Sequence, residues 1–220
     1  MFSPTAYSKI TAQLPASVRL IAVTKTKAIA DIEAAYSAGL RDFAESRVQE
    51  ALPKIAALSH LQGIEWHFIG RLQGNKARKV VEHFTWIHSV DHLSLAQRLN
   101  RIAQELACSP NVLLQVKLLP DANKTGWTAA QLSQEIQELQ TLKFLTIKGL
   151  MTILPLGIPA ADRQAAFQKT TDFAHQLTQA FDMNLSELSM GMSQDYPQAI
   201  AAGATMIRLG TILFGEREAL

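Results

Sequence analysis

A lysine at the end of an apolar run is the first residue in this chain that could do covalent chemistry. Lys25 directly follows Leu20–Thr24, with no glycine or proline between them, and such residue types suit a buried strand. Alternation along a strand over Arg19–Lys25 puts the lysine on the same face as Ile21 and Val23. A lysine that loses solvent there has a lowered pKa, and its free amine can attack a carbonyl. The alternative is a lysine that only extends from the strand end into solvent.

Two short segments late in the chain have the composition of an anion site. Residues 191–193 (Gly-Met-Ser) and 210–211 (Gly-Thr) each follow a predicted strand and open a predicted helical segment. Backbone N–H groups at helix starts favour anions, and the loops after the last two strands of an eight-stranded barrel are a common phosphate site. In the alternative interpretation Ser193 is only a helix N-cap, and Gly210 is only a turn residue.

Arg208 lies in the last predicted strand, Thr205–Leu209. Alternation puts Met206 and Arg208 on one face and Ile207 on the other, so one of the two faces points inward. An inward arginine needs a partner, because an unpaired buried guanidinium is very costly. A carboxylate could serve, and so could an acceptor atom of a bound ligand; an arginine on the surface is the remaining alternative.

Other chemical signatures are missing from the sequence. The histidines lack the paired spacing of a zinc site, and there is no Gly-x-Ser-x-Gly elbow and no Walker-type loop. A basic cluster is formed by Arg71, Lys76, Arg78 and Lys79. With a net charge of only +2, a solvated helix face is the preferred interpretation of this cluster, and nucleic-acid binding is not predicted.

Strand and helix patterns alternate along the 220 residues. The predicted strands cover residues 19–25, 42–45, 64–70, 85–90, 112–117, 144–150, 185–189 and 205–209. A first helix is expected over Tyr7–Leu14, and Ser46 with Gln49 matches a capping box before the helix that follows the second strand. Eight such units without a linker predict an α/β fold, a parallel (β/α)8 TIM barrel forming a single domain over residues 1–220. A doubly wound sheet is the alternative, but no Gly-rich dinucleotide fingerprint follows the first strand.

Composition points to a protein of the cytoplasm. Hydrophobic residues make up 48% of the chain and charged residues 18%, which predicts a sizeable core. Cys108 is the single cysteine and cannot form an internal disulfide, as suits a reducing compartment. The amino terminus lacks the pattern of a secretory signal, and no apolar run reaches the length of a membrane span.

Several separated motifs resemble the pyridoxal phosphate homeostasis protein family, over nearly the whole chain and in the right order. They are residues 22–27 (Ala-Val-Thr-Lys-Thr-Lys), 65–76 (Glu-Trp-His-Phe-Ile-Gly-Arg-Leu-Gln-Gly-Asn-Lys), 149–151 (Gly-Leu-Met), 189–193 (Ser-Met-Gly-Met-Ser) and 208–211 (Arg-Leu-Gly-Thr). The resemblance implies a monomeric barrel of the alanine racemase N-terminal domain type (PLP fold type III). It also implies bound pyridoxal 5′-phosphate (PLP), no established catalytic activity, and a role in vitamin B6 and amino-acid homeostasis.

The resemblance also assigns roles to residues. It implies that Lys25 holds PLP as a Schiff base, with Lys27 as the rival, and that Arg208 faces the pyridine nitrogen. The phosphate would be held by Ser193, Gly210 and Thr211, and the remaining cofactor-binding candidates are Met190, His67 and Ser46. The family commonly has Phe-Gly-Glu-Asn where this chain has Phe-Ala-Glu-Ser at residues 43–46. Ser46 therefore either contacts the cofactor through a shorter side chain or acts only as the N-cap.

Three functions are compatible with these residues. The preferred one is a non-catalytic PLP-binding protein that serves PLP-dependent apo-enzymes. The second is a PLP-dependent racemase or decarboxylase, and the third is a regulatory protein that acts through a protein partner. An arginine beside the pyridine nitrogen weakens the ring as an electron sink. The related racemases take a tyrosine base from a second subunit, whereas Tyr7, Tyr36 and Tyr196 of this chain have no evident catalytic position.

Overall fold

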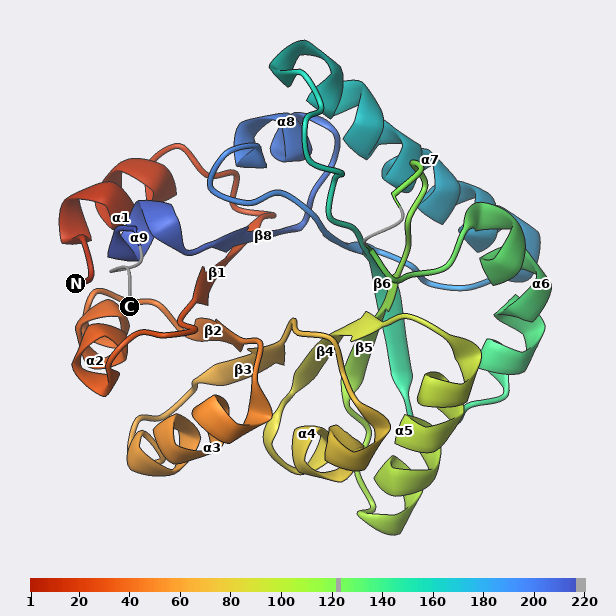
Figure 1. The fold of residues 1–220 in the computed structure, drawn as a ribbon, viewed down its shortest axis with the longest axis horizontal. Coiled ribbons are helices and arrows are strands. Elements are labelled where there is room, and N and C mark those ends of the chain that lie inside the picture. The colour runs from red at the N-terminus through yellow and green to blue at the C-terminus, as the bar shows by residue number, and fades with distance from the viewer. Residues whose placement is uncertain (122–123, 217–220) are drawn as a thin grey trace.

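The strands of this protein close into a parallel barrel that runs in chain order, with each strand paired to the next and β8 paired to β1 (Figure 1). The structure is a computed structural model that describes residues 1–121 and 124–216. Over those residues the strands are β1 (Arg19–Val23), β2 (Asp42–Glu45), β3 (Glu65–Phe68), β4 (Trp86–Val90), β5 (Asn111–Gln115), β6 (Thr146–Met151), β7 (Glu187–Ser189) and β8 (Met206–Leu209). The predicted (β/α)8 barrel is confirmed.

Helices surround the ring of strands (Figure 1). In the described residues they are α1 (Pro4–Thr11), α2 (Ile29–Ser37), α3 (Val48–Ala57), α4 (Ala77–His83), α5 (Leu93–Glu105), α6 (Ala129–Gln140), α7 (Arg163–Phe181), α8 (Tyr196–Ala201) and α9 (Thr211–Phe214), with short 3₁₀ helices η1 (Gly74–Lys76) and η2 (Ala160–Asp162). Close to the amino terminus, Ser3 N donates to Leu213 O at 2.8 Å, so α1 lies beside α9. No helix in this part of the chain is both long and apolar enough to cross a lipid bilayer.

Alternation along the strands divides the buried side chains into two layers. One layer lies between strands and helices and contains residues such as Phe43, Ile87 and Leu114. The other fills the barrel itself, with an apolar part formed by Ile21, Val23, Ala44, Trp86, Leu113, Met151 and Met206. Ile21 and Val23 therefore share one face of β1, as alternation predicted, and that face points into the barrel.

Several predicted boundaries shift by a few residues, and two of these shifts have a clear local cause. α1 begins at Pro4 rather than Tyr7, because Ser3 Oγ accepts a hydrogen bond from Ala6 N at 3.3 Å and proline suits the first helical turn. β5 ends at Gln115 rather than at residue 117, because the chain beyond it pairs with its own loop. Trp127 N donates to Gln115 O at 2.9 Å, and Lys117 N donates to Trp127 O at 2.9 Å.

Both predicted helix caps are wrong. α3 begins at Val48 with Arg47 at the N-cap position, so Ser46 and Gln49 form no capping box. α8 begins at Tyr196 with Asp195 before it, so Ser193 does not cap that helix. Ser46 lies one residue before the N-cap position of α3, and Ser193 lies two residues before that of α8.

Candidate functional site

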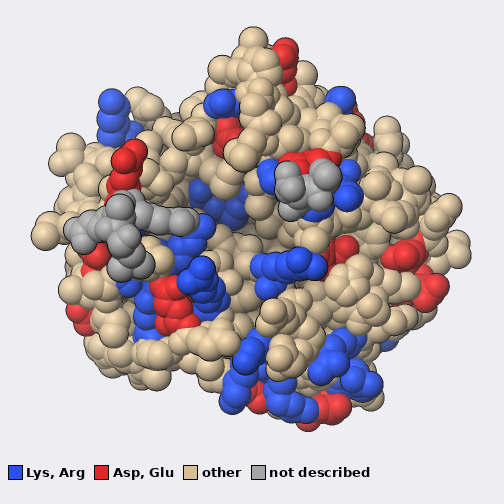
Figure 2. Space-filling view, viewed as in Figure 1, with Lys and Arg blue, Asp and Glu red and all other residues tan. Residues whose placement is uncertain are grey.

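A cavity of about 380 Å³ opens where the carboxyl ends of the strands converge. This volume lies within the roughly 300–1,000 Å³ common for small-molecule sites. Six of the predicted site residues line it: Lys25, Ser46, Ser193, Arg208, Gly210 and Thr211. Met190 and His67 are fully buried and do not belong to the cavity lining. Lysine and arginine side chains gather around the centre of the face in Figure 2, and the cationic residues in the described lining are Lys25, Lys27, Arg163 and Arg208.

Lys25 lies in a turn rather than in the strand. β1 ends at Val23, and Lys27 N donates to Thr24 O at 3.0 Å, which closes the turn around the lysine. Thr26 has a φ of 64°, in the left-handed region that a β-branched residue rarely adopts. Such a conformation costs about 1–3 kcal/mol and persists only when the surroundings hold it in place.

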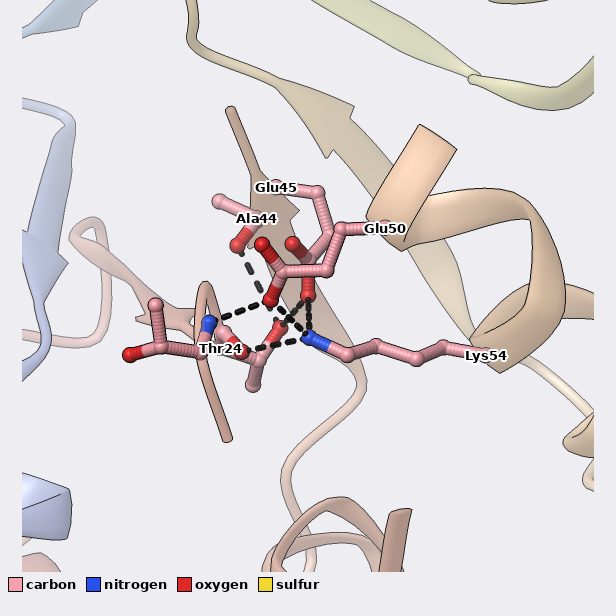
Figure 3. Close-up of polar contacts among 6 residues, drawn as sticks. Thr24, Ala44, Glu45, Glu50 and Lys54 are labelled. Atoms are coloured by element: carbon pink, nitrogen blue, oxygen red, sulfur yellow. Dashed lines mark hydrogen bonds and ion pairs between the residues drawn. The ribbon is translucent and has the colours of Figure 1, made fainter. Parts of the chain in front are cut away.

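A polar cluster behind the turn holds the residues on both sides of Lys25 (Figure 3). Thr24 Oγ1 donates to Glu45 Oε1 at 2.8 Å, and Lys54 Nζ donates to Thr24 O at 2.8 Å. Glu50 Oε1 accepts a hydrogen bond from the Thr26 N–H and another from Lys54 Nζ, the latter at 2.7 Å. Lys54 Nζ also donates to Glu45 Oε1 at 2.8 Å. The turn that presents Lys25 is thus bonded to β2 and α3.

Burial sets the charges of this cluster. Glu45 is completely buried, which raises the pKa of its carboxyl even though Lys54 acts against the shift. Its second oxygen, Oε2, has no hydrogen-bond partner among the described residues. Burial also acts to raise the pKa of Glu50, but the hydrogen bonds from Lys54 and Thr26 outweigh it and the pKa is lowered. The single charge of Lys54 is therefore shared between two carboxylates on the far side of the turn.

The rival lysine, Lys27, is differently engaged. Its Nζ donates to Phe214 O at 3.0 Å, at the end of α9. The left-handed turn at Thr26 breaks the alternation that would have placed the two lysines on one strand face. Lys25 and Lys27 both line the cavity, but Lys27 also ties the turn to the carboxyl-terminal helix.

Arg208 faces the barrel interior and is 3% exposed. Its partners are a hydroxyl and a backbone carbonyl: Nη1 donates to Ser189 Oγ at 2.6 Å, and Nη2 donates to Thr152 O at 3.0 Å. Burial lowers the pKa of Arg208 to about 10, although the charge of Asp195 opposes the shift, so the guanidinium remains charged at neutral pH. The sequence left open whether a carboxylate is the partner of Arg208, and among the described residues no hydrogen bond from Arg208 to a carboxylate is observed.

The loops after β7 and β8 are joined by one of the predicted phosphate ligands. Ser193 Oγ accepts a hydrogen bond from Ile212 N at 3.4 Å, and Gly210 and Thr211 begin α9 as predicted. Gly191 lets the loop after β7 pack closely on α8, because its φ is 92° and a Cβ there would lie 2.6 Å from the Cβ of Ala199. Hydroxyl and N–H groups from two loops therefore meet at one side of the cavity.

Comparison with known proteins identifies the family. Residues 6–218 match the family described as alanine racemase, N-terminal domain. A pyridoxal phosphate homeostasis protein of Synechocystis sp. is 66% identical over 217 residues, which cover 99% of this chain and 100% of that protein. The chain belongs to the pyridoxal phosphate homeostasis protein family. Another member, from Pseudomonas aeruginosa, is 44% identical over 93% of this chain and 86% of its own length.

Solved structures agree with this family assignment. PipY from Synechococcus elongatus, determined with PLP bound, has a TM-score of 0.93 and 54% identity, covering 96% of this chain and 99% of that one. Alanine racemase from Clostridium difficile has a TM-score of 0.79 at 17% identity and is covered over 60% of its length. At that identity the likeness concerns the fold alone.

Two groups of residues near this family site were not predicted from the sequence. Lys54 and Glu50 are four positions apart on α3, a spacing typical of a surface ion pair, and nothing local indicates that Lys54 reaches the turn of Lys25. His88 and Ser189 were assigned no role from the sequence, yet they contact each other inside the barrel. No three His, Cys, Asp or Glu side chains of the described residues come together as a metal ion would require.

Proposed function

We propose that this chain binds PLP in the cavity at the barrel mouth, through a Schiff base on Lys25, and acts in vitamin B6 and amino-acid homeostasis. The observation that supports this most directly is the meeting of a lysine, an inward arginine and two polar loops around one cavity. PipY, 54% identical to this chain, has been solved with PLP bound. The curated relatives are named pyridoxal phosphate homeostasis proteins.

The residues that line the cavity fit the three functional parts of PLP. The Lys25 amine suits the aldehyde, because a lysine whose solvent is partly removed is a better nucleophile toward a carbonyl. Ser193, Gly210 and Thr211 offer hydroxyl and N–H donors to the phosphate, and the cationic lining of the cavity favours its charge. Arg208 would lie beside the pyridine nitrogen, the acceptor atom that the sequence left open as its partner.

A carrier role accounts for these residues better than catalysis does. Bound PLP supplies an electron-withdrawing ring, but an arginine is a donor only and disfavours a proton on the ring nitrogen. The described lining contains no Tyr or His. Its carboxylate, Asp195, is buried and already accepts from Met192 N at 2.6 Å. We therefore propose a non-catalytic protein.

The wider setting belongs to the same proposal. We place the protein in the cytoplasm as a monomer, with residues 1–220 forming one PLP-binding domain. Its partners would be PLP-dependent apo-enzymes or a regulatory protein, and neither nucleic acid nor a membrane is required. The cavity remains the feature that any such partner would have to reach in order to receive the cofactor.

Reduction with borohydride tests the attachment. The PLP-loaded protein is reduced, digested and mapped by mass spectrometry, and the pyridoxyl group is expected on Lys25. A Lys27→Ala variant should keep the label, and a Lys25→Ala variant should lose it. A label found on Lys27 in the native protein would overturn the assignment.

Two further measurements separate the alternatives. Pyridoxal, which lacks the phosphate, should bind much more weakly than PLP; equal affinities would remove the anion site from the proposal. A turnover screen of the PLP-loaded protein against amino acids should show no racemisation or decarboxylation above that of free PLP. Rapid turnover of any amino acid would favour the enzyme instead.

A further inference from the structure

Polar side chains form an unbroken chain through the interior of the barrel. From the cavity to the opposite end its members are Arg208, Ser189, His88, His67, Asp42 and Arg19, and they come from β8, β7, β4, β3, β2 and β1. The successive distances between their nitrogen and oxygen atoms are 2.6, 2.8, 2.9, 3.0 and 2.5 Å. The first four members are fully or almost fully buried. The chain therefore joins the cavity to the partly exposed Arg19–Asp42 pair at the amino ends of the strands.

The protonation of Asp42, at the end of the chain away from the cavity, determines the direction of the hydrogen bonds. Asp42 has a lowered pKa: burial acts to raise it, but the hydrogen bond from His67 and the charge of Arg19 outweigh burial. An ionised carboxylate only accepts, so the proton of His67 must be on Nε2. Neutral His67 then accepts at Nδ1, and the facing proton must be on His88 Nε2.

The same reasoning continues toward the cavity. Neutral His88 accepts at Nδ1, so the Ser189 hydroxyl donates to it. The free electron pairs of Ser189 Oγ are then directed at Arg208, whose Nη1 donates to them. The direction of each hydrogen bond is thus set by the next one in the chain. From Arg208 to His67, each residue donates to the following one, and the last acceptor is Asp42.

We propose that His67 and His88 are positioning residues for the cofactor site: they orient the Ser189 hydroxyl so that it accepts from Arg208, and thereby hold the guanidinium beside the cavity. This inference deepens the proposed function, because it assigns Arg208 to the cofactor. The ring of His67 is held in place by Trp86, which stacks on it at 5.8 Å between ring centroids and 9° between the planes.

One added proton reverses the chain. A proton from solvent at the cavity would bind Ser189 Oγ while the hydroxyl proton passes to His88 Nδ1, and the Nε2 proton of His88 passes to His67 Nδ1. His67 is then a cation beside Asp42, and the Ser189 hydroxyl accepts from His88 Nδ1 instead of donating to it. Ser189 Oγ now accepts from two donors, which weakens the hydrogen bond that it accepts from Arg208; one proton has been gained and no other charge has changed.

The charged groups around the two imidazoles oppose this uptake at neutral pH. Burial lowers the pKa of His67, against the attraction of Asp42 on β2 and Glu65 on β3, and Arg19 on β1 adds to the lowering. Burial lowers the pKa of His88 still further, with contributions from His67, Arg208 and Arg19. The reversed chain should therefore form only in acid.

Two substitutions of His88 separate positioning from simple packing. His88→Leu removes the acceptor for Ser189 and should weaken PLP binding about ten- to hundredfold, the loss expected for one hydrogen bond to a charged group. His88→Asn keeps an amide oxygen near the position of Nδ1 and should retain PLP at neutral pH. Because the asparagine no longer reaches His67, the acid limb of its PLP-affinity profile should shift relative to the native protein. His83→Asn, at a partly exposed histidine outside the chain, is the matched control and should leave both unchanged.

Nitrogen-15 NMR of the PLP-free protein tests the chain without the cofactor. Both imidazoles should carry their proton on Nε2 at neutral pH, and a proton on Nδ1 of either ring would overturn the inference. Equal PLP affinity in His88→Leu and native protein would overturn it as well. So would a result in which the Leu and Asn variants lose the same PLP affinity, in proportion to their loss of thermal stability. If native protein fails to bind PLP, the proposed function fails, while the NMR result still decides the direction of the chain.

Discussion

Replacing Lys54 by methionine tests how the Lys25 turn is held. The substitution keeps most of the aliphatic side chain but removes the ammonium that bonds to Thr24 O, Glu45 Oε1 and Glu50 Oε1 at 2.7–2.8 Å (Figure 3). Glu45 is then left as a buried carboxylate without its cation, while Glu50, whose side chain is 25% exposed, can be solvated. Most of the loss should therefore come from Glu45.

Removing one partner of a buried ion pair costs about 3–5 kcal/mol, and the exposed share of the Glu50 pair adds at most about 1 kcal/mol. With a urea m-value of about 2–3 kcal/mol/M, the unfolding midpoint should fall by roughly 1–3 M. Lys79→Met is the matched control, because Lys79 is 56% exposed and pairs with Glu82 on the surface of α4. Its midpoint should hardly move.

The loss should depend on pH and on Glu45. The raised pKa of Glu45 should rise further without Lys54, so the folded variant binds more protons than the unfolded chain as pH falls. Stability then increases toward low pH relative to the native protein, and the deficit shrinks between pH 7 and pH 5. The double variant Lys54→Met/Glu45→Gln should recover most of the loss, because replacing both charges of a buried pair is often close to neutral.

The same variant should bind PLP more weakly, because the turn that presents Lys25 loses bonds on both of its sides. Titrating the variant with PLP without urea, where the variant is still folded, and recording the absorbance measures this loss of affinity. This account of the cluster would be refuted if Lys54→Met had the same urea midpoint as the native protein at pH 7. It would also be refuted if the double variant were no more stable than Lys54→Met.

Three further predictions follow from other residues of the site. Arg208→Ala should weaken PLP binding by about 1.5–3 kcal/mol, the value of a hydrogen bond to a charged group, as measured by equilibrium titration; unchanged affinity would separate Arg208 from the cofactor. Gly191→Ala should destabilise the fold by about 1–3 kcal/mol in thermal unfolding, and more than Gly157→Ala, which has a similar φ of 83° but no atom within 4 Å of the added Cβ. Stability should fall with pH below about 6.5, because burial lowers the pKa values of His67 and His88 and the unfolded chain then binds more protons than the folded one; urea titrations that give a flat profile between pH 7 and 5.5 would contradict it.

The arrangement of strands could be predicted because it depends on local periodicity. Apolar runs of about five residues separated by helical patterns identify parallel strands wherever they lie in the chain. In a parallel barrel all carboxyl ends meet at one face, so the order of elements alone brings residues after β1, β7 and β8 together. Lys25, Ser193 and Thr211 line one cavity for this reason.

Helix caps were predicted wrongly because their sequence pattern does not say where the chain turns into the helix. Ser46 and Ser193 have the residue types of N-caps, but Ser46 lies one residue and Ser193 two residues before the position that adopts the cap. A Cβ at Gly70 would lie 2.0 Å from the carbonyl oxygen of Ser46, which shows how closely the end of β3 packs on this residue. Such packing sets the start of α3 and is not encoded in the four residues of the motif.

Contacts between residues distant in sequence were decided by the tertiary structure alone. Lys54 and Thr24 are 30 positions apart, and His88 and Ser189 are 101 positions apart, so no local rule relates them. Alternation left open whether Arg208 points inward, because a strand has two equivalent faces. Closure of the barrel removes that equivalence: β8 pairs with β1 so that Arg208 lies beside Ile21, and Ile21 is in the core.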